Sequence, residues 1–429
     1  MITYWHQKVF ALDDKFNSLR FSDNSAFGTL YIHRRSQMLC EKYIKHCSVQ
    51  TYYLKFRNSF LRQRYGEIRE SNSMVYSLNE DMYAGFQRKL NDIQQRTTAK
   101  NFAFDGVHHI FDQHTAAISM IKFANNDRSK ICCASFDGHI SICEVTSTPP
   151  RVVCIILGHK KGVTAIDWSI SNDLIVSSSL DSTLRLWQLH SDLKLECLRV
   201  VGDPMSAEVL SCAFVPANNN LVITGNAQGY LQIVNISTGK YTRDGTCQMG
   251  GKILSIACEE SGGTLVWAGN DRGVVFSFRF IPRSHRLSRL RRIEGLGGQV
   301  TSISWRTWLS KEFPWPTLLI SSACNAVTLY RVVDDKGSLV RWKKYPVKHR
   351  QYLVHSTFCP QMGASLIATG SEDGSVHLLD STKEGKAARV NRLLGHATPV
   401  VALCFNYDES LLATAEYQGL IIIWRNNSC

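Results

Sequence analysis

The sequence predicts an all-β fold, a seven-bladed β-propeller that follows a partly helical, basic N-terminal arm. Residues 158–187 combine a Gly-His pair, an Asp in a tight turn and a closing Trp with short runs of alternating apolar and small polar residues. Runs of this period indicate half-buried strands. The same template returns at residues 395–424, and units of this kind recur at blade length between residues 102 and 429.

Seven units follow one another in this region, and their closing positions are 43 to 53 residues apart. That interval is close to the length of one four-stranded blade. The longest interval contains the stretch RTWLSKEFPWPT, whose two prolines predict a loop because proline interrupts a central strand. The closing positions are Cys143, Trp187, Val234, Ser277, Tyr330, Leu379 and Trp424.

The last blade is expected to take its fourth strand from the start of the repeat region. Only residues 425–429 follow Trp424, too few for a further strand of normal length. The segment FAFDGVHHIF, residues 102–111, directly precedes the first repeat and is placed to supply the strand. This pairing would cover an open strand edge. We therefore expect residues 102–429 to form one propeller, closed by the strand 102–111.

Residues 1–101 do not show the repeat. Apolar residues at three- and four-residue spacings predict short amphipathic helices in a basic arm, residues 1–66, followed by a polar linker, residues 67–101. The stretch 31–65 contains eight Lys and Arg residues and one acid, Glu41. Such patches attract anionic partners, although a solvated helix face is the alternative. The candidate partner-binding residues are Arg34, Arg35, Arg57, Arg62 and Arg64.

The overall composition favours an intracellular protein. The net charge of +13 is concentrated in the arm and in two further clusters, Arg279–Arg292 and Arg341–Arg350. No run of 18 apolar residues is present, and the first residues lack the apolar core of a signal peptide, so no membrane association is expected. The 14 cysteines include no Cys-x-x-Cys pair and are expected to be free thiols.

The Gly-His start, the turn Asp and the closing Trp resemble the WD-repeat family. In that family the matching positions form a hydrogen-bonded network, so the resemblance implies a structural tetrad of His159, Ser177, Asp181 and Trp187. A buried carboxylate is stable only when several donors satisfy it, which gives the network a physical reason. A catalytic reading of the His, Ser and Asp is rejected because they have matches in several blades. The last blade matches with His396, Thr414 and Trp424.

Only the second blade is complete, and we expect the ring to be less regular around blades three to five. The other blades depart from the template at one or more positions. Three blades keep part of the template: blade one keeps His114 and Asp137, blade four keeps Asp271, and blade six keeps Thr369 and Asp373 but has Leu379 in place of Trp. Three blades have another residue at the Asp position: Gln228 in blade three, Cys324 in blade five and Gln418 in blade seven.

Neither a metal, a cofactor nor a small-molecule substrate is expected. His108 and His109 are adjacent on a strand and point to opposite faces, so with His114 they do not converge on one ion. The predicted inner strands offer only Lys122, Asp167 and Glu259, a poor set of ligands for an enzyme built around a central metal.

Further motifs narrow the resemblance to one member of the WD-repeat family. It implies a non-enzymatic, largely nuclear scaffold, with some cytoplasmic protein, that binds other proteins in transcriptional regulation or proliferation control. The alternative is nucleic-acid binding by residues 31–65, where aromatic residues are interleaved with the charges. The motifs include Arg34-Arg35-Ser36-Gln37, Gln63-Arg64-Tyr65-Gly66, His109-Ile110-Phe111-Asp112-Gln113-His114, Ala268-Gly269-Asn270-Asp271-Arg272-Gly273 and Asp408-Glu409-Ser410-Leu411-Leu412-Ala413.

Overall fold

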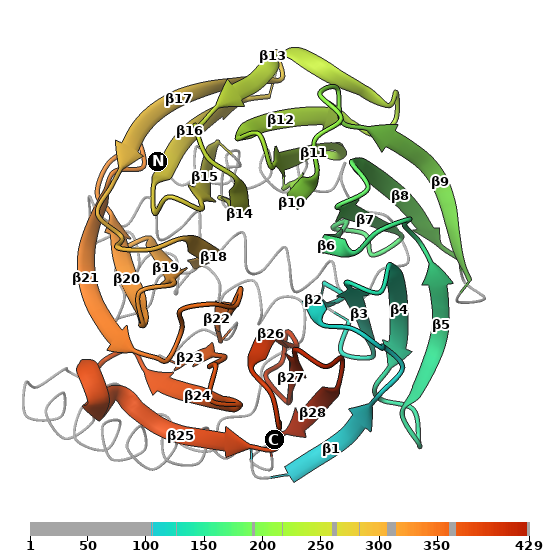
Figure 1. Ribbon diagram of the computed structural model, residues 1–429, viewed down its shortest axis with the longest axis vertical. Coiled ribbons are helices and arrows are strands. Elements are labelled where there is room, and N and C mark those ends of the chain that lie inside the picture. The colour runs from blue at the N-terminus through green and yellow to red at the C-terminus, as the bar shows by residue number, and fades with distance from the viewer. Residues whose placement is uncertain are drawn as a thin grey trace, which may run out of the picture. The chain divides into compact units, whose positions relative to one another are not determined.

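The computed structural model describes residues 104, 106–125, 127–190, 194–216, 218–259, 264–282, 284–306, 315–359 and 366–426. Within them the chain forms seven four-stranded sheets around a central axis (Figure 1). This confirms the all-β, seven-bladed propeller. The expected helical arm at 1–66 and the linker at 67–101 lie outside the described residues, as does most of the loop expected at 306–317.

The first three blades run in chain order from the inner to the outer strand. Blade one contains β2 (Ile118–Phe123), β3 (Lys130–Ser135), β4 (His139–Glu144) and β5 (Arg151–Leu157). Blade two contains β6 (Val163–Trp168), β7 (Leu174–Ser179), β8 (Thr183–Leu189) and β9 (Leu195–Gly202). Blade three contains β10 (Val209–Val215), β11 (Asn218–Asn226), β12 (Tyr230–Asn235) and β13 (Lys240–Gln248).

The next three blades repeat this order. Blade four contains β14 (Ile253–Cys258), β15 (Leu265–Asn270), β16 (Val275–Ile281) and β17 (Arg286–Ile293). Blade five contains β18 (Val300–Arg306), β19 (Thr317–Ser322), β20 (Ala326–Val332) and β21 (Leu339–Pro346). Blade six contains β22 (Ser356–Phe358), β23 (Leu366–Thr369), β24 (Ser375–Asp380), the 3₁₀ turn η1 (Gly385–Ala388) and β25 (Arg389–Leu394).

Blade seven joins the two ends of the propeller. It contains β26 (Val400–Phe405), β27 (Leu411–Glu416), β28 (Ile421–Arg425) and, as its outer strand, β1 (Gly106–Phe111). β1 pairs antiparallel with β28, with Val107 opposite Trp424 and Phe111 opposite Ile421 (Figure 1). The ring is therefore closed by strands from opposite ends of the repeat region, and β28 has a hydrogen-bonded neighbour on each side.

The turn between the second and third strands has a residue of positive φ in every blade. Five of the seven are glycine, which adopts this conformation without a steric penalty because it has no Cβ. This turn is the one in which the repeat template places its Asp. The residues are Gly138, Ser182, Gly229, Gly273, Asn325, Gly374 and Gly419.

The hydrophobic core lies between the blades. It consists of seven clusters, and each cluster combines buried side chains of two neighbouring blades. The cluster between blades seven and one, for example, contains Phe111 from β1, Ile121 from β2 and Ile423 from β28. Each blade therefore buries both of its faces only when its two neighbours are present.

The eleven described cysteines are free, and five of them are buried. No helix among the described residues is long and apolar enough to span a lipid bilayer.

Candidate interaction surface and its structural tetrads

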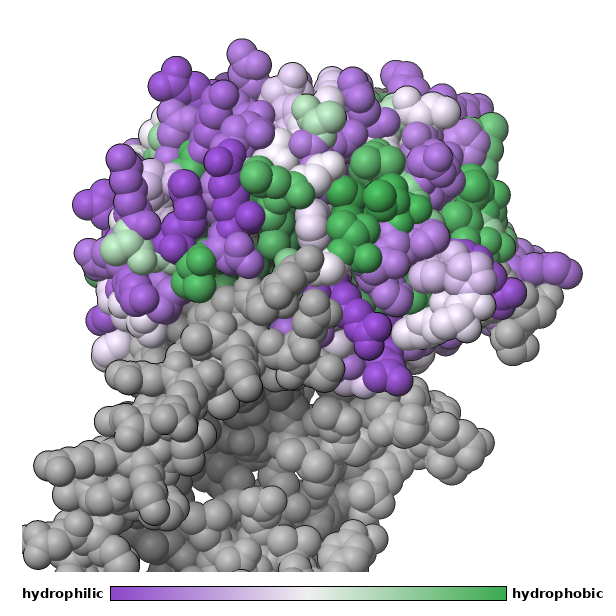
Figure 2. Space-filling view, turned by 90° about the horizontal axis from the view of Figure 1, so that it is seen from below, coloured by the Kyte–Doolittle hydropathy of each residue, from purple (hydrophilic) through white to green (hydrophobic). Residues whose placement is uncertain are grey.

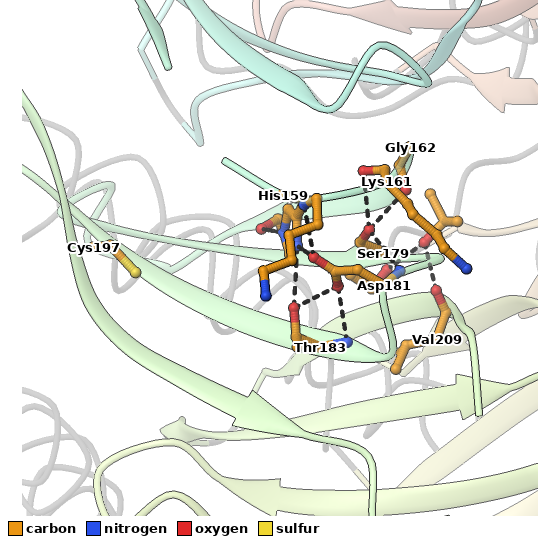
Figure 3. Close-up of polar contacts among 12 residues, drawn as sticks. His159, Lys161, Gly162, Ser179, Asp181, Thr183, Cys197 and Val209 are labelled. Carbon is orange, nitrogen blue, oxygen red and sulfur yellow. Dashed lines mark hydrogen bonds and ion pairs between the residues drawn. The ribbon is translucent and has the colours of Figure 1, made fainter. Parts of the chain in front are cut away.

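The four tetrad residues of blade two come from four different parts of the blade. Figure 3 labels two of them, His159 and Asp181, which contact each other. His159 lies in the loop before β6, Ser177 on β7, Asp181 in the β7–β8 turn and Trp187 on β8. Trp187 Nε1 donates to Ser177 Oγ at 2.8 Å. His159 Nε2 lies 2.7 Å from the same hydroxyl, and His159 Nδ1 lies 3.1 Å from Asp181 Oδ2.

These contacts fix the direction of every hydrogen bond in the tetrad. The indole N–H only donates, so the Ser177 hydroxyl is free to donate its own hydrogen to His159 Nε2. The hydrogen on Nδ1 then donates to Asp181. Burial lowers the pKa of His159 to about 4, so the ring is neutral at physiological pH. The tetrad therefore contains one charge, the carboxylate.

Asp181 has further donors. Burial alone would raise the pKa of Asp181, but hydrogen bonds from the Thr183 hydroxyl and the Lys160 N–H, together with His159, bring it below its usual value. Thr183 Oγ1 lies 2.5 Å and Lys160 N 3.0 Å from the carboxylate (Figure 3). The carboxylate thus pins the β5–β6 loop to the β7–β8 turn.

The glycine of the Gly-His pair is explained by packing. A Cβ at Gly158 would lie 3.1 Å from the Trp187 ring, and one at Gly395 would lie 3.0 Å from the Trp424 ring. Most side-chain atoms stay farther apart than this, so a larger residue would displace the indole that the tetrad needs.

Blade seven forms the same network with a different acid. His396 Nε2 lies 2.7 Å from Thr414 Oγ1, which also accepts from Trp424 Nε1 at 2.8 Å. His396 Nδ1 lies 3.2 Å from the carboxylate of Glu416, the last residue of β27. Gln418, at the expected Asp position, is exposed in the turn. The longer side chain of Glu416 replaces the missing turn Asp, and sequence alignment by spacing missed it.

Blade one keeps two tetrad residues and recruits a third from another strand. His114 Nδ1 lies 3.0 Å from Asp137 Oδ2, and burial lowers the pKa of His114 although Asp137 opposes the shift. His114 Nε2 contacts Ser141 Oγ at 2.8 Å. Ser141 lies on β4, opposite Cys133 on β3, and so supplies the hydroxyl that the second strand lacks.

Blades three and six have no tetrad and form other polar contacts near the turn between their second and third strands. In blade three the Asp position Gln228 is not used, and Asn226 Nδ2 donates to Asp203 Oδ1 at 3.2 Å. Asp203 also accepts from the N–H groups of Met205 and Ala207. In blade six Asp373 accepts from Ser375 within the turn and pairs with Arg392 at 2.9 Å, while Thr369 donates to a backbone carbonyl.

Blades four and five are joined by tryptophans and a turn. Trp267 stacks on Trp305 with ring centroids 4.9 Å apart, and its Nε1 donates to Gly337 O in the β20–β21 turn at 3.2 Å. Ser277 Oγ donates to the same turn, at Lys336 O. Asp271, kept from the template, is not part of a tetrad, and its buried Oδ1 accepts no hydrogen bond from the described residues.

The polar side chains of the inner strands also bind one another. Lys122 Nζ and Asp167 Oδ1 form an ion pair at 2.7 Å between blades one and two, and Asp167 Oδ2 accepts from the N–H of Phe214 in blade three. Glu259 accepts from the N–H of Leu265. Among the described residues, no group of three His, Cys, Asp or Glu side chains could hold a metal ion.

Two kinds of surface remain available for partners. On the tetrad face, defined by the loops into the inner strands and the turns between second and third strands, four large apolar side chains are exposed. These are Phe136, Met205, Leu353 and Tyr417. Exposed apolar groups rimmed by polar residues are typical of protein-binding surfaces.

The rim of the disc carries further exposed aliphatic side chains on three neighbouring outer strands. Figure 2 faces the edge that carries β25, β1 and β5 and shows hydrophobic areas interrupting a hydrophilic coat. The exposed residues on the outer strands of blades seven, one and two are Val107, Ile110, Ile155, Leu157, Leu198 and Val200.

Comparison with known proteins agrees with this geometry. The family model described as "WD domain, G-beta repeat" matches residues 151–188 and 388–425, that is, the stretches from β5 to β8 and from β25 to β28. These two segments are thus similar to WD40 repeats. The two matched segments include the three inner strands of blades two and seven, the two blades that hold complete tetrads.

The relatives match different shares of the chain. WD repeat-containing protein SL1-17 of Schistosoma mansoni is 28% identical over 35% of this chain and 48% of its own length. The WD repeat-containing protein 26 homolog of Arabidopsis thaliana is 24% identical over 73% and 49%. The chain thus spans about half the length of these two relatives.

A third relative is named as an enzyme. The E3 ubiquitin-protein ligase COP1 of Pisum sativum is 32% identical over 23% of this chain and 15% of its own length. WD40 propellers themselves are typically non-enzymatic scaffolds that bind other proteins. The candidate partner-binding arginines of the arm, Arg34, Arg35, Arg57, Arg62 and Arg64, lie outside the described residues.

Proposed function

We propose that the chain is a non-enzymatic nuclear scaffold that holds partner proteins together in transcriptional regulation or proliferation control. The scaffold role is supported by one observation: the His, Ser and Asp side chains of the tetrads form hydrogen bonds to one another inside the blades and are not available for catalysis. The side chains of His159 and His396 are buried, and each binds a hydroxyl and a carboxylate of its own blade. What remains exposed is a face of loops and a rim.

The nuclear location and the transcriptional role are proposed from the resemblance of the sequence motifs. The arm and propeller motifs named above are similar to those of WD repeat-containing protein 13, and the proposal carries that protein's class of role to this chain. A fluorescent fusion in cells tests it. Nuclear enrichment with some cytoplasmic signal is expected, and exclusion from the nucleus would contradict it.

The scaffold role is tested on the tetrad face. Proximity labelling in cells compares the wild-type chain with a variant carrying Phe136→Glu, Leu353→Glu and Tyr417→Glu. The matched control carries Ile170→Glu and Tyr407→Glu, exposed residues in the turns of the opposite face. The first variant is expected to lose a defined set of proteins that the control retains. Identical labelling by all three chains would contradict partner binding at this face.

Nucleic-acid binding by residues 31–65 is the second candidate. Its support is the density of Lys and Arg in that stretch, interleaved with Tyr52, Tyr53, Phe56 and Phe60. Binding of this kind weakens steeply with salt because phosphate contacts release counterions. A chain that binds no labelled oligonucleotide even at low salt would exclude it.

A further inference from the structure

The outer strands of blades four and five carry only positive charge. Two basic clusters that lie far apart in the sequence meet on these neighbouring strands, which are adjacent in Figure 1. The outer strands of blades seven, one and two carry just Arg151, Glu196 and Arg199. We call β17 and β21 the basic rim. Its charged residues are Arg286, Arg289, Arg291 and Arg292 on β17 and Arg341, Lys343 and Lys344 on β21.

Aromatic rings hold several of these cations in place. The guanidinium groups of Arg289 and Arg292 lie 5.0 and 5.8 Å from the ring centroid of Phe276. Beside β21, Arg331 lies 3.9 Å from the ring of Trp315 and 4.3 Å from that of Trp342. Stacking restricts the guanidinium plane, so less conformational freedom is lost when an anion binds.

β21 also borders a groove. Lys343 Nζ donates to Ser381 O at 2.7 Å and so fixes the segment before η1 alongside the strand. An open depression lies between them, with exposed Val340 nearby on β21. The depression is lined by Arg341, Trp342, Lys343, Lys344, Glu384 and Gly385.

We propose that the basic rim docks an acidic, extended segment of a partner protein that also carries apolar side chains. This deepens the scaffold function proposed above and depends on it. The Asp and Glu side chains of such a segment pair with Arg291, Arg341 and Lys344, while an apolar residue contacts the exposed Val340. Planar guanidinium groups match carboxylates with two parallel hydrogen bonds.

The aromatic residues favour a protein partner over a nucleic acid. Base binding without sequence preference depends on aromatic faces that accept a stacked base. Here Trp315 and Trp342 both contact the Arg331 guanidinium, and Trp342 has Lys343 5.0 Å from its ring as well. Both tryptophans thus already serve as partners for cations.

The test measures binding of labelled probes to the full chain by fluorescence anisotropy. The probes are a short peptide alternating Glu and Asp with Leu and Phe, the same peptide with Gln and Asn for the acids, and a single-stranded DNA oligonucleotide. The rim variant is Arg291→Glu with Lys344→Glu. The matched control, Lys240→Glu with Arg243→Glu, makes the same charge change at exposed positions of β13.

The acidic peptide is expected to bind the wild-type chain, and the neutral peptide is not. The rim variant is expected to weaken this binding about tenfold, because two attractive contacts become repulsive, while the control stays within about twofold. A chain with the five arm arginines changed to Ala is expected to keep its affinity. These outcomes are independent of the labelling experiment on the tetrad face.

Three results would overturn the proposal. The rim variant binds the acidic peptide as tightly as the wild-type chain, or the control weakens binding equally, or the rim variant loses affinity for DNA and not for the peptide. The last result would assign the rim to nucleic acid. Equal melting temperatures of the variants and the wild-type chain establish that each one is folded.

Discussion

Blades two and four have the same four strands but are held by different chemistry. In blade two, Trp187, Ser177, His159 and Asp181 form a continuous hydrogen-bonded chain inside one blade. In blade four, Trp267 stacks on a tryptophan of blade five and donates to the β20–β21 turn of that blade. The first device joins strands within a blade, and the second joins one blade to the next.

The comparison shows that every blade packs against its neighbours through apolar side chains, and that the tetrad is one of several polar networks that add to this packing. All seven apolar clusters bridge neighbouring blades, whether or not a tetrad is present. The turn in blade four is held by Asn270, whose Oδ1 accepts from the N–H groups of Arg272 and Val274. The sequence led us to expect a less regular ring around blades three to five, but each of these blades has four strands and a buried apolar cluster on both sides. We therefore revise that expectation: the blades that lack a tetrad are expected to be as ordered as those that have one.

Removing the closing strand should have the largest effect on both kinds of blade. A chain that starts at residue 98 retains β1 and is expected to fold. A chain that starts at residue 115 loses β1, exposes the β28 edge and removes Phe111 from the cluster between blades seven and one. Size-exclusion chromatography and calorimetry should show an aggregated or non-cooperative protein. Equal melting temperatures of the two chains would mean that closure by β1 is dispensable.

The two buried tryptophans test whether the two devices are equally important. Trp187→Ala and Trp267→Ala are each expected to lower the free energy of unfolding by about 3–5 kcal/mol, because both indoles are almost fully buried. Urea titration followed by circular dichroism measures the change. If Trp267→Ala left stability almost unchanged, the stack between blades four and five would not replace a tetrad.

Acid should weaken the tetrad of blade two through His159. The pKa of His159 is about 4 in the folded state and near 6.5 when unfolded, so stability is intact above 6.5. As pH falls from 6.5 towards 4, only the unfolded state binds the proton, at about 1.4 kcal/mol of lost stability per pH unit. Urea titrations between pH 7.5 and 4.5 should show stability falling with pH, and the slope for His159→Gln should be shallower than that of the wild-type chain by about this amount. Identical slopes would contradict a buried neutral His159.

The smallest expected effect compares Glu416, which contacts His396, with Gln418, which occupies the expected Asp position of blade seven. Glu416→Gln removes the charge that accepts from His396 and from the Ala397 N–H, and should lower stability by about 1–3 kcal/mol. Gln418→Ala, in the exposed turn, should have almost no effect. If Gln418→Ala lowered the melting temperature more than Glu416→Gln, the partner of His396 would be Gln418 and not Glu416.

The strands and turns of the blades were predictable because short, local sequence patterns determine them. Alternating strands, the tight turn with its Asp and the Gly-His pair are local features, and each closing position from Cys143 to Trp424 lies on the third strand of its blade. The cysteines predicted to lie on strands are buried at Cys132, Cys133 and Cys212 but only partly buried at Cys258 and Cys404.

The replacements for the tetrad were not predictable from spacing. Glu416 acts from a position two residues before the expected acid, which its longer side chain permits, and Ser141 acts from the third strand instead of the second. One signal was present: a charged Glu416 ending the otherwise apolar and small strand LLATAE requires a buried partner. The contact of Trp267 with Gly337 joins residues 70 positions apart, and no periodicity reports such a pair.

The central claim is that blades with and without tetrads are equally fixed, which makes the whole disc a rigid support for binding. Hydrogen exchange followed by mass spectrometry tests it directly on the full chain. Similar protection is expected for β6–β8 of blade two and β14–β16 of blade four, with Asp181→Asn lowering protection mainly in blade two. Rapid exchange in β14–β16 beside slow exchange in β6–β8 of the wild-type chain would contradict it.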